Sequence, residues 1–352
     1  MKLRPPGFWF RPAGWQTELL WPAAELYGRV ATQRLREAPR REAGAPTLCI
    51  GNFTMGGGGK TPTALALAAA AKAAGHHPGF LTRGHGGQAR IPLLVDRERH
   101  GARLVGDEPL LLADKAPTAV SPDRWAGTML LRHAGCDLFL MDDGFQSAQL
   151  RADLSLLVVD GARGLGNART FPAGPLRAPL HAQWPLADAL LLVGEGEAGR
   201  EVAARAERDG KPVHRARLVA EEEGFYGLRC LAFSGIADPL KFHRSLAETG
   251  AEIAGTRDFP DHHPFTEEDA AALLREADAK DLVPVTTAKD HVRLLDGGPA
   301  ARELAGRARV LAVALRFDDE GAPGRILAAC LAAYEARAPA SSSRWSEAAG
   351  SA

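Results

Sequence analysis

A glycine-rich segment followed by lysine and threonine is the strongest chemical signal in this 352-residue sequence. Residues 54–61 read Thr-Met-Gly-Gly-Gly-Gly-Lys-Thr, between an apolar run and an alanine-rich run. Glycines let backbone N–H groups turn toward phosphate oxygens, and a helix N-terminus adds partial positive charge. Lys60 would then reach the β- and γ-phosphates, while the hydroxyl of Thr61 would bind Mg²⁺. The segment predicts a nucleoside triphosphate site, although Thr54 replaces the first glycine of the consensus; a flexible glycine-rich turn is the alternative.

Two adjacent aspartates follow another apolar run. Residues 138–141 read Leu-Phe-Leu-Met, and Asp142 and Asp143 come directly after them. In P-loop enzymes such a strand end carries the acidic side of the metal site, whereas a helix cap is the alternative. Gln146 is expected to position the γ-phosphate or an acceptor hydroxyl. The predicted metal ligands are Thr61, Glu108, Asp142 and Asp143, and the predicted nucleotide-binding residues are Thr54, Met55, Gly56, Gly57, Gly58, Gly59, Lys60, Thr61 and Gln146.

The nucleotide is expected to be ATP. GTPases read guanine with an Asn/Thr-Lys-x-Asp element, and in the nearest candidate no residue separates Lys289 from Asp290. A regulatory GTPase is therefore disfavoured.

The elements that must hold these residues alternate between apolar runs and helical segments from residue 46 onward. This pattern predicts an α/β fold with a doubly wound, mainly parallel sheet of the P-loop NTPase type. The alternation of apolar runs with helical segments begins again after about residue 224, which predicts a second, smaller α/β domain. The expected strands are 47–52, 80–82, 93–95, 119–120, 137–141, 154–159, 189–193, 231–234, 252–254, 282–286 and 310–314, and the expected helices include 61–74, 239–248 and 267–276. The predicted division is an N-terminal amphipathic helix region (1–40), a P-loop domain (41–220), the smaller domain (221–337) and a disordered tail (338–352).

The first forty residues combine aromatic and basic side chains. Three of the six tryptophans, Trp9, Trp15 and Trp21, lie here. Aromatic rings at headgroup depth with arginines toward anionic lipid are typical of a helix on a membrane surface. We expect peripheral membrane contact; a helix docked on the domain with its aromatic residues buried is the alternative.

Bulk composition excludes several classes of protein. Lys+Arg and Asp+Glu both total 43, so no net charge attracts the chain to nucleic acid. No stretch reaches the roughly 18 uncharged apolar residues of a membrane span, and the start lacks the pattern of a cleavable signal. The four cysteines are far apart, which favours buried thiols over disulfides. A cytoplasmic chain, attached to a membrane at most peripherally, is expected.

Short motifs in a fixed order extend from about residue 6 to about residue 295. They lie at 6–9, 51–52, 83–87, 106–109, 123–124, 142–146, 166–167, 172–177, 259–263 and 286–290. The last two read Phe-Pro-Asp-His-His and Thr-Thr-Ala-Lys-Asp, and the segment at 142–146 reads Asp-Asp-Gly-Phe-Gln. Several are weak alone, but the ordered set is specific: the sequence resembles the tetraacyldisaccharide 4′-kinases, also called lipid A 4′-kinases.

The resemblance implies transfer of the γ-phosphate of ATP, with Mg²⁺, to the 4′-hydroxyl of a tetraacylated glucosamine disaccharide 1-phosphate. It places this step of lipid A biosynthesis at the cytoplasmic face of the bacterial inner membrane, in a cleft between two domains. Four residues depart from the family's usual ones: His85 for tyrosine, Ser147 for histidine, Ala178 for glutamate and Ala288 for glutamate. None lies in the phosphate loop or the aspartate pair, so they bear on substrate detail and metal geometry more than on activity.

Asp107 is the candidate base, because a kinase needs a group that accepts the proton of the acceptor hydroxyl. Asp107 precedes an apolar helix, where capping is the alternative role, and by resemblance it corresponds to the family's catalytic aspartate. His262 is expected to raise the basicity of Asp107 or to orient it, with domain closure bringing the two together. A zinc site at 261–263 is disfavoured because no cysteine lies nearby. The predicted catalytic residues are Asp107, His262 and Lys60.

Other charged residues stay ambiguous in the sequence. Arg83 and Arg124 are candidates for phosphate or substrate contacts, with surface ion pairs as the rival role. Lys289 and Asp290 are expected to stabilise the second domain or the adenine region rather than to act in chemistry.

Two other function classes remain open at this point. One is another P-loop ATPase or an ATP-dependent ligase at the membrane surface, and the other is a non-catalytic nucleotide switch or scaffold. Phosphate transfer to an acceptor, as opposed to ATP hydrolysis alone, would distinguish them.

Overall fold

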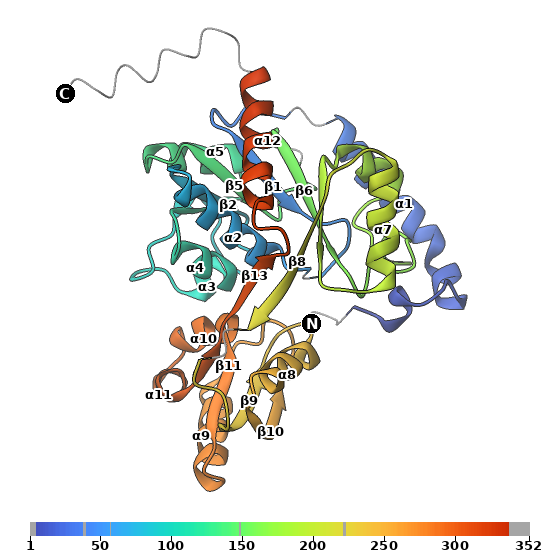
Figure 1. Ribbon diagram of the computed structural model, residues 1–352. Helices are drawn as coiled ribbons and strands as arrows, with labels where there is room; N and C mark the ends of the chain where they lie inside the picture. The colour runs from blue at the N-terminus through green and yellow to red at the C-terminus, as the bar shows by residue number, and fades with distance from the viewer. Residues whose placement is uncertain (1–4, 38–39, 57, 148, 221–222, 338–352) are drawn as a thin grey trace, which may run out of the picture.

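A computed structural model describes residues 5–37, 40–56, 58–147, 149–220 and 223–337. Two sheets organise this part of the chain (Figure 1): a nine-stranded sheet in the order β13-β8-β7-β6-β1-β5-β2-β4-β3, and a four-stranded sheet in the order β10-β9-β11-β12. The predicted tail at 338–352 lies outside the described residues.

The larger sheet is mainly parallel. Its strands are β1 (Thr47–Gly51), β2 (Pro78–Thr82), β3 (Leu93–Leu94), β4 (Thr118–Val120), β5 (Leu138–Asp142), β6 (Leu154–Asp160), β7 (Ala189–Val193), β8 (Val213–Ala220) and β13 (Val313–Phe317). Only the β3–β4 and β13–β8 pairs are antiparallel among its described pairings. β1, β2, β5 and β7 are buried along their whole length, as expected for parallel strands covered on both faces. The predicted doubly wound sheet is confirmed.

Helices cover both faces of this sheet because successive strand side chains point to opposite sides. Leu48 and Ile50 pack with one set of helices, and Cys49 packs with the other. The helices are α1 (Trp15–Glu37), α2 (Lys60–Ala73), α3 (Ala102–Val105), α4 (Asp107–Ala113), α5 (Arg124–His133), α6 (Leu180–Gln183), α7 (Glu197–Arg208) and α12 (Ala322–Arg337), with 3-10 turns η1 (Gly7–Phe10) and η2 (Trp184–Leu186). α2 and α12 share one core, and α5 and α7 share the other.

The smaller sheet is entirely parallel in its described pairings. Its elements are β9 (Arg229–Ser234), α8 (Pro239–Glu248), β10 (Glu252–Asp258), α9 (Glu267–Ala279), β11 (Val283–Thr287), α10 (Ala288–Leu295), α11 (Pro299–Arg307) and β12 (Arg309–Leu311). Helix α8 packs on one face, and α9 and α11 pack on the other.

The single strand predicted at 310–314 is wrong. The chain forms two short strands there: β12 pairs with β11 in the smaller sheet, and β13 pairs with β8 in the larger one. The chain thus returns to the larger sheet, where α12 packs its Ile326, Leu327 and Cys330. The part of the predicted smaller domain beyond residue 312 therefore belongs with the P-loop sheet, because an apolar run does not reveal which sheet it joins.

Helix α1 lies on the same side of the larger domain as α7 (Figure 1). None of the described helices combines the length and the apolar character that crossing a membrane requires.

Candidate active site

The phosphate loop joins β1 to α2 and is shaped by glycine. Gly56 and Gly59 have φ of +106° and +93°, which side chains rarely adopt. At Gly51 the requirement is space, because an added Cβ would lie 2.4 Å from Cβ of Phe145. Gly57 lies outside the described residues. The loop therefore leads directly into the N-terminus of α2, where a phosphate group is favoured.

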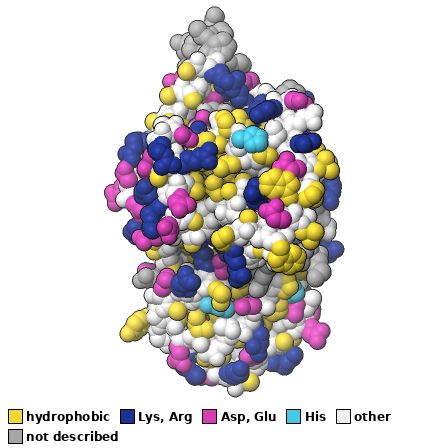
Figure 2. Space-filling model, turned by 90° about the vertical axis from the view of Figure 1, so that its right-hand side faces the viewer, with side chains coloured by type: hydrophobic (Ala, Val, Ile, Leu, Met, Phe, Trp, Pro, Cys, Tyr) yellow, Lys and Arg dark blue, Asp and Glu magenta, His cyan; other side chains and the backbone are white. Residues whose placement is uncertain are grey.

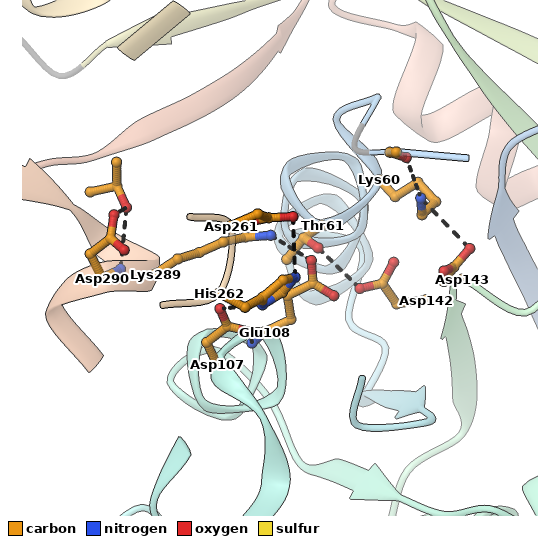
Figure 3. Close-up of polar contacts among 12 residues, drawn as sticks. Lys60, Thr61, Asp107, Glu108, Asp142, Asp143, Asp261, His262, Lys289 and Asp290 are labelled. Atoms are coloured by element: carbon orange, nitrogen blue, oxygen red, sulfur yellow. Dashed lines mark hydrogen bonds and ion pairs between the residues drawn. The ribbon is translucent and has the colours of Figure 1, made fainter. Parts of the chain in front are cut away.

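Lys60 and Thr61 both point toward the aspartate pair (Figure 3). Nζ of Lys60 lies 3.6 Å from Oδ1 of Asp143, and the hydroxyl of Thr61 donates to Oδ2 of Asp142 at 3.2 Å. The sequence predicted these residues to share a site, and the structure brings them together at the carboxyl ends of β1 and β5.

The two aspartates differ in their electrostatic environment. Burial raises the pKa of Asp142 to about 7, and the nearby charges of Glu108 and Asp143 act in the same direction. Burial also opposes ionisation of Asp143, but Lys60 and Arg177 outweigh it and lower the pKa of Asp143 to about 2. Asp143 is thus held as an anion, whereas Asp142 needs a further cation to ionise fully near neutrality.

Mg²⁺ fits this corner of the site. Oδ1 of Asp142 is buried and has no hydrogen-bond partner among the described residues. Mg²⁺ prefers oxygen ligands and keeps several waters, so it takes few protein side chains. Among the described residues, Glu108, Asp142 and Asp143 do not form a group of three carboxylates arranged to hold a metal. Asp142 and Thr61 would supply donor oxygens to such a cation.

Glu108, the fourth predicted metal ligand, is paired with a cation of the chain itself. Its carboxylate accepts a hydrogen bond from Nζ of Lys289, which comes from α10 beside the smaller sheet. Lys289 lowers the pKa of Glu108, although burial opposes this shift. Burial likewise opposes the charge of Lys289, yet Glu108 and Asp107 raise its pKa above the ordinary value. Lys289 thus also pairs with a carboxylate of the larger domain, and the expectation that it stabilises the second domain or the adenine region rather than acting in chemistry stays a prediction.

Asp107 begins α4 and is only 3% exposed. Oδ1 accepts the N–H of Glu108 at 2.9 Å, and Oδ2 lies 3.3 Å from Nδ1 of His262 and 2.9 Å from Nε of Arg293. Burial would raise the pKa of Asp107, but the hydrogen bond with His262 and the positive charge of Arg293 hold it well below its ordinary value. The predicted increase in basicity by His262 is thus wrong, and its orienting role stays a prediction.

Gln146 is fixed beside the phosphate loop. Its amide nitrogen donates to the carbonyl of Asn52 at 2.8 Å and to the side chain of Gln183 at 3.0 Å. Its oxygen accepts from Arg177, which also donates to Asp143 at 3.1 Å and to the carbonyl of Thr54 at 3.0 Å. Arg177 therefore links the loop to the aspartate pair.

Arg83 and Arg124, the two arginines with candidate phosphate or substrate contacts, differ in burial. Arg124 is 3% exposed, and its Nη2 donates to the carbonyl of Asp143 at 3.4 Å, so a surface ion pair is not its role. Arg83 is exposed. His85 presents its ring edge-on to His262, with ring centroids 5.7 Å apart, whereas Ala178 is buried in an apolar cluster with Leu35.

Sequence reasoning missed Arg293 altogether. The available signal was the spacing of Lys289 and Arg293, four positions apart on one helix, which places both on the same face. Asp107 and Glu108, the carboxylates that they meet, are adjacent in sequence.

Comparisons with known proteins agree with this geometry. A family model described as tetraacyldisaccharide-1-P 4′-kinase matches residues 16–332. The tetraacyldisaccharide 4′-kinase of Sinorhizobium medicae is 50% identical over 333 residues, covering 94% of this chain and 96% of the relative. The protein of the same name from Methylobacterium radiotolerans is 50% identical over 332 residues, covering 94% and 100%.

One solved structure supports the fold. A crystal structure of LpxK from Aquifex aeolicus in complex with ATP has a TM-score of 0.69 and 23% sequence identity, covering 90% of this chain and 99% of that one.

Proposed function

Because the chain belongs to the tetraacyldisaccharide-1-P 4′-kinase family, we propose that Asp107 accepts the proton of the sugar hydroxyl that this kinase phosphorylates. The enzyme transfers the γ-phosphate of ATP to the 4′-hydroxyl of a tetraacylated glucosamine disaccharide 1-phosphate, a step of lipid A biosynthesis. The observation that carries the assignment is the position of Asp107: a buried carboxylate at the start of α4, in the same site as the phosphate loop and held by His262 from the second domain (Figure 3).

Each group of the site has a defined part in the transfer. The loop N–H groups and Lys60 hold the phosphates of ATP, while Thr61 and Asp142 would hold Mg²⁺. When bound, Mg²⁺ neutralises charge on the phosphate oxygens. Asp107 receives the proton of the acceptor hydroxyl as the phosphoryl group moves, and His262 orients the carboxylate. Because phosphoryl transfer passes through a loose transition state, the placement of the carboxylate matters more than high basicity.

The outer face of α1 supports a peripheral position on the membrane, and we place it at the cytoplasmic face. Trp15, Leu19, Leu26 and Val30 are exposed, and at about 100° per residue they fall within a stripe of roughly 60°. The buried residues of the helix lie on the opposite side. Arginines flank the stripe, as in helices that rest on anionic lipid. Figure 2 looks onto this face, where hydrophobic side chains gather beside Lys and Arg.

A groove of about 660 Å³ beside α1 is the path that we propose for the lipid acceptor. It lies between α1 and residues 168–181, and its lining includes Trp21, Arg29 and Arg169. The segment 168–181 also touches the phosphate loop, since the N–H of Met55 donates to the carbonyl of Pro175 at 2.7 Å. The segment that lines one side of the groove thus also contacts the phosphate loop through Pro175.

A radiolabel assay tests the proposed base. Wild type and Asp107→Asn are compared with γ-labelled ATP and detergent-dispersed acylated glucosamine disaccharide 1-phosphate, with nucleotide affinity measured separately. We expect labelled lipid from wild type, a rate lower by about 10²- to 10⁴-fold in Asp107→Asn, and similar ATP binding. A variant as fast as wild type would reject Asp107 as the base; ATP hydrolysis without labelled lipid in wild type would favour another P-loop class.

A further inference from the structure

Arg293 is the second residue that the smaller domain presents to Asp107. It lies on α10, and its Nε and Nη2 both donate to Oδ2 of Asp107. The side chains are 7% and 3% exposed, so water competes little for this contact. The two N–H donors converge on a single oxygen, so the charge of the guanidinium is concentrated at Oδ2 and Oδ1 is left outside this contact.

The other side of the guanidinium is also fixed. Nη1 of Arg293 donates to Oδ1 of Asp290 at 2.7 Å and to the carbonyl of Gly235 at 2.8 Å. Asp290 is itself held by the N–H of Gly235 at 3.0 Å and the hydroxyl of Thr287 at 2.7 Å. Because a guanidinium is planar, these contacts set the plane in which it meets Asp107.

Gly235 connects Arg293 to His262 through its backbone carbonyl. The carbonyl of Gly235 accepts the backbone N–H of His262 at 2.9 Å in addition to Nη1 of Arg293. His262 holds an unusual backbone conformation, with φ of +57°. The histidine and the arginine therefore reach Oδ2 of Asp107 from one rigid support.

We propose that Arg293 is a positioning residue for phosphoryl transfer, fixing Oδ2 of Asp107 so that Oδ1 is presented to the acceptor hydroxyl. Among the described contacts Oδ1 accepts only the N–H of Glu108, which leaves it a lone pair for the proton. The inference rests on the proposed function, in which Asp107 is the proton acceptor. Its physical basis is that small misplacements of a reacting group lower the rate of transfer strongly.

Arg293→Lys is the decisive variant. An ammonium keeps the charge beside the buried carboxylates but cannot span Asp107, Asp290 and Gly235 as the planar fork does. We expect Arg293→Lys to fold, to keep the KM for ATP within about twofold, and to lower kcat for lipid phosphorylation by about tenfold or more. Arg293→Met removes the guanidinium shared by the buried carboxylates of Asp107 and Asp290, so we expect a lower unfolding temperature and a deeper loss of kcat.

Arg163→Lys is the matched control. Arg163 makes another ion pair between the larger and smaller domains, with Asp238 at 2.7 Å, and does not touch Asp107. We expect its kcat to stay within about twofold of wild type, since no reacting group moves. Equal losses in Arg163→Lys and Arg293→Lys would reduce Arg293 to a general domain link and overturn the proposal, as would an Arg293→Lys enzyme with kcat equal to or above wild type. Failure of wild type to label lipid would instead reject the proposed function.

Discussion

The hydroxyl of Thr61 lies 3.2 Å from Oδ2 of Asp142, although the residues are 81 positions apart. The register of the sheet explains the contact. β1 and β5 are parallel neighbours in which Ile50 pairs with Asp142, so the loop after β1 and the carboxylate at the end of β5 meet at one edge. Side chains at this edge can share a cation that neither strand could hold alone.

Thr61→Val should weaken the use of Mg²⁺. Valine keeps the shape of threonine but removes the hydroxyl that bonds Asp142, so we expect the Mg²⁺ concentration for half-maximal activity to rise by about 10- to 100-fold. Thr61→Ser retains the hydroxyl and should stay near wild type. Titration of Mg²⁺ at saturating ATP measures both variants, and equal requirements in Thr61→Val and Thr61→Ser would contradict the assignment.

Asp142 should give the nucleotide-free protein a distinctive pH dependence. Its pKa is raised from 3.8 to about 7 in the folded state, so the folded protein binds more protons than the unfolded chain between these values. Stability must then fall as pH rises through this window. We expect Asp142→Asn to remove that decline, as seen in the difference between the denaturant unfolding free energies of wild type and variant from pH 4 to pH 7.

If the difference in unfolding free energy between wild type and Asp142→Asn does not change from pH 4 to pH 7, Asp142 is already ionised in the folded protein.

Asp107 and Asp143 affect stability in the opposite direction, because their pKa values are lowered in the folded state. Protonation of these two carboxylates below about pH 4 lowers the stability of the folded protein. The two effects therefore fall in separate pH ranges.

Gly51→Ala should destabilise the site from within. The added methyl group would lie 2.4 Å from Cβ of Phe145, so the backbone must shift, at a cost of about 1–3 kcal/mol. Gly306→Ala is the control, because Gly306 is exposed in α11 with open space around it and should gain about 0.5–1 kcal/mol. Chemical denaturation measures the unfolding free energy of both variants. Equal unfolding free energies for Gly51→Ala and Gly306→Ala would contradict the close approach of Gly51 to Phe145.

The apolar stripe of α1 should bind lipid. Replacing Trp15, Leu19 and Leu26 together by alanine removes apolar surface without disturbing the buried side of the helix. We expect binding to anionic phospholipid vesicles to weaken by at least about tenfold, and the KM for the lipid acceptor to rise. Leu240→Ala, which changes a residue 71% exposed in the smaller domain, serves as the control in the same vesicle sedimentation. Unchanged binding in the triple variant would place the membrane contact elsewhere.

Local sequence patterns predicted much of the fold and part of the candidate site. The glycine-rich loop, the buried strands and the aspartate pair were readable because each depends on neighbouring residues: apolar runs for strands, glycine for the phosphate-binding turn, and carboxylates at a strand end. The α8 helix at Pro239–Glu248 coincides with its prediction. The division of residues 309–317 into two strands, β12 and β13, was missed because both strands lie in one apolar run. Hydrophobicity alone does not show which sheet a strand joins.

The sequence by itself determined the nucleotide loop, the acidic strand end and the α/β architecture, since these follow from short-range chemistry. Only the tertiary structure decided the partners of the carboxylates on α4. Arg293 meets Asp107 from 186 positions away, and Lys289 meets Glu108 from 181 positions away. Such contacts depend on how the two sheets are placed relative to one another, and no local pattern encodes that placement.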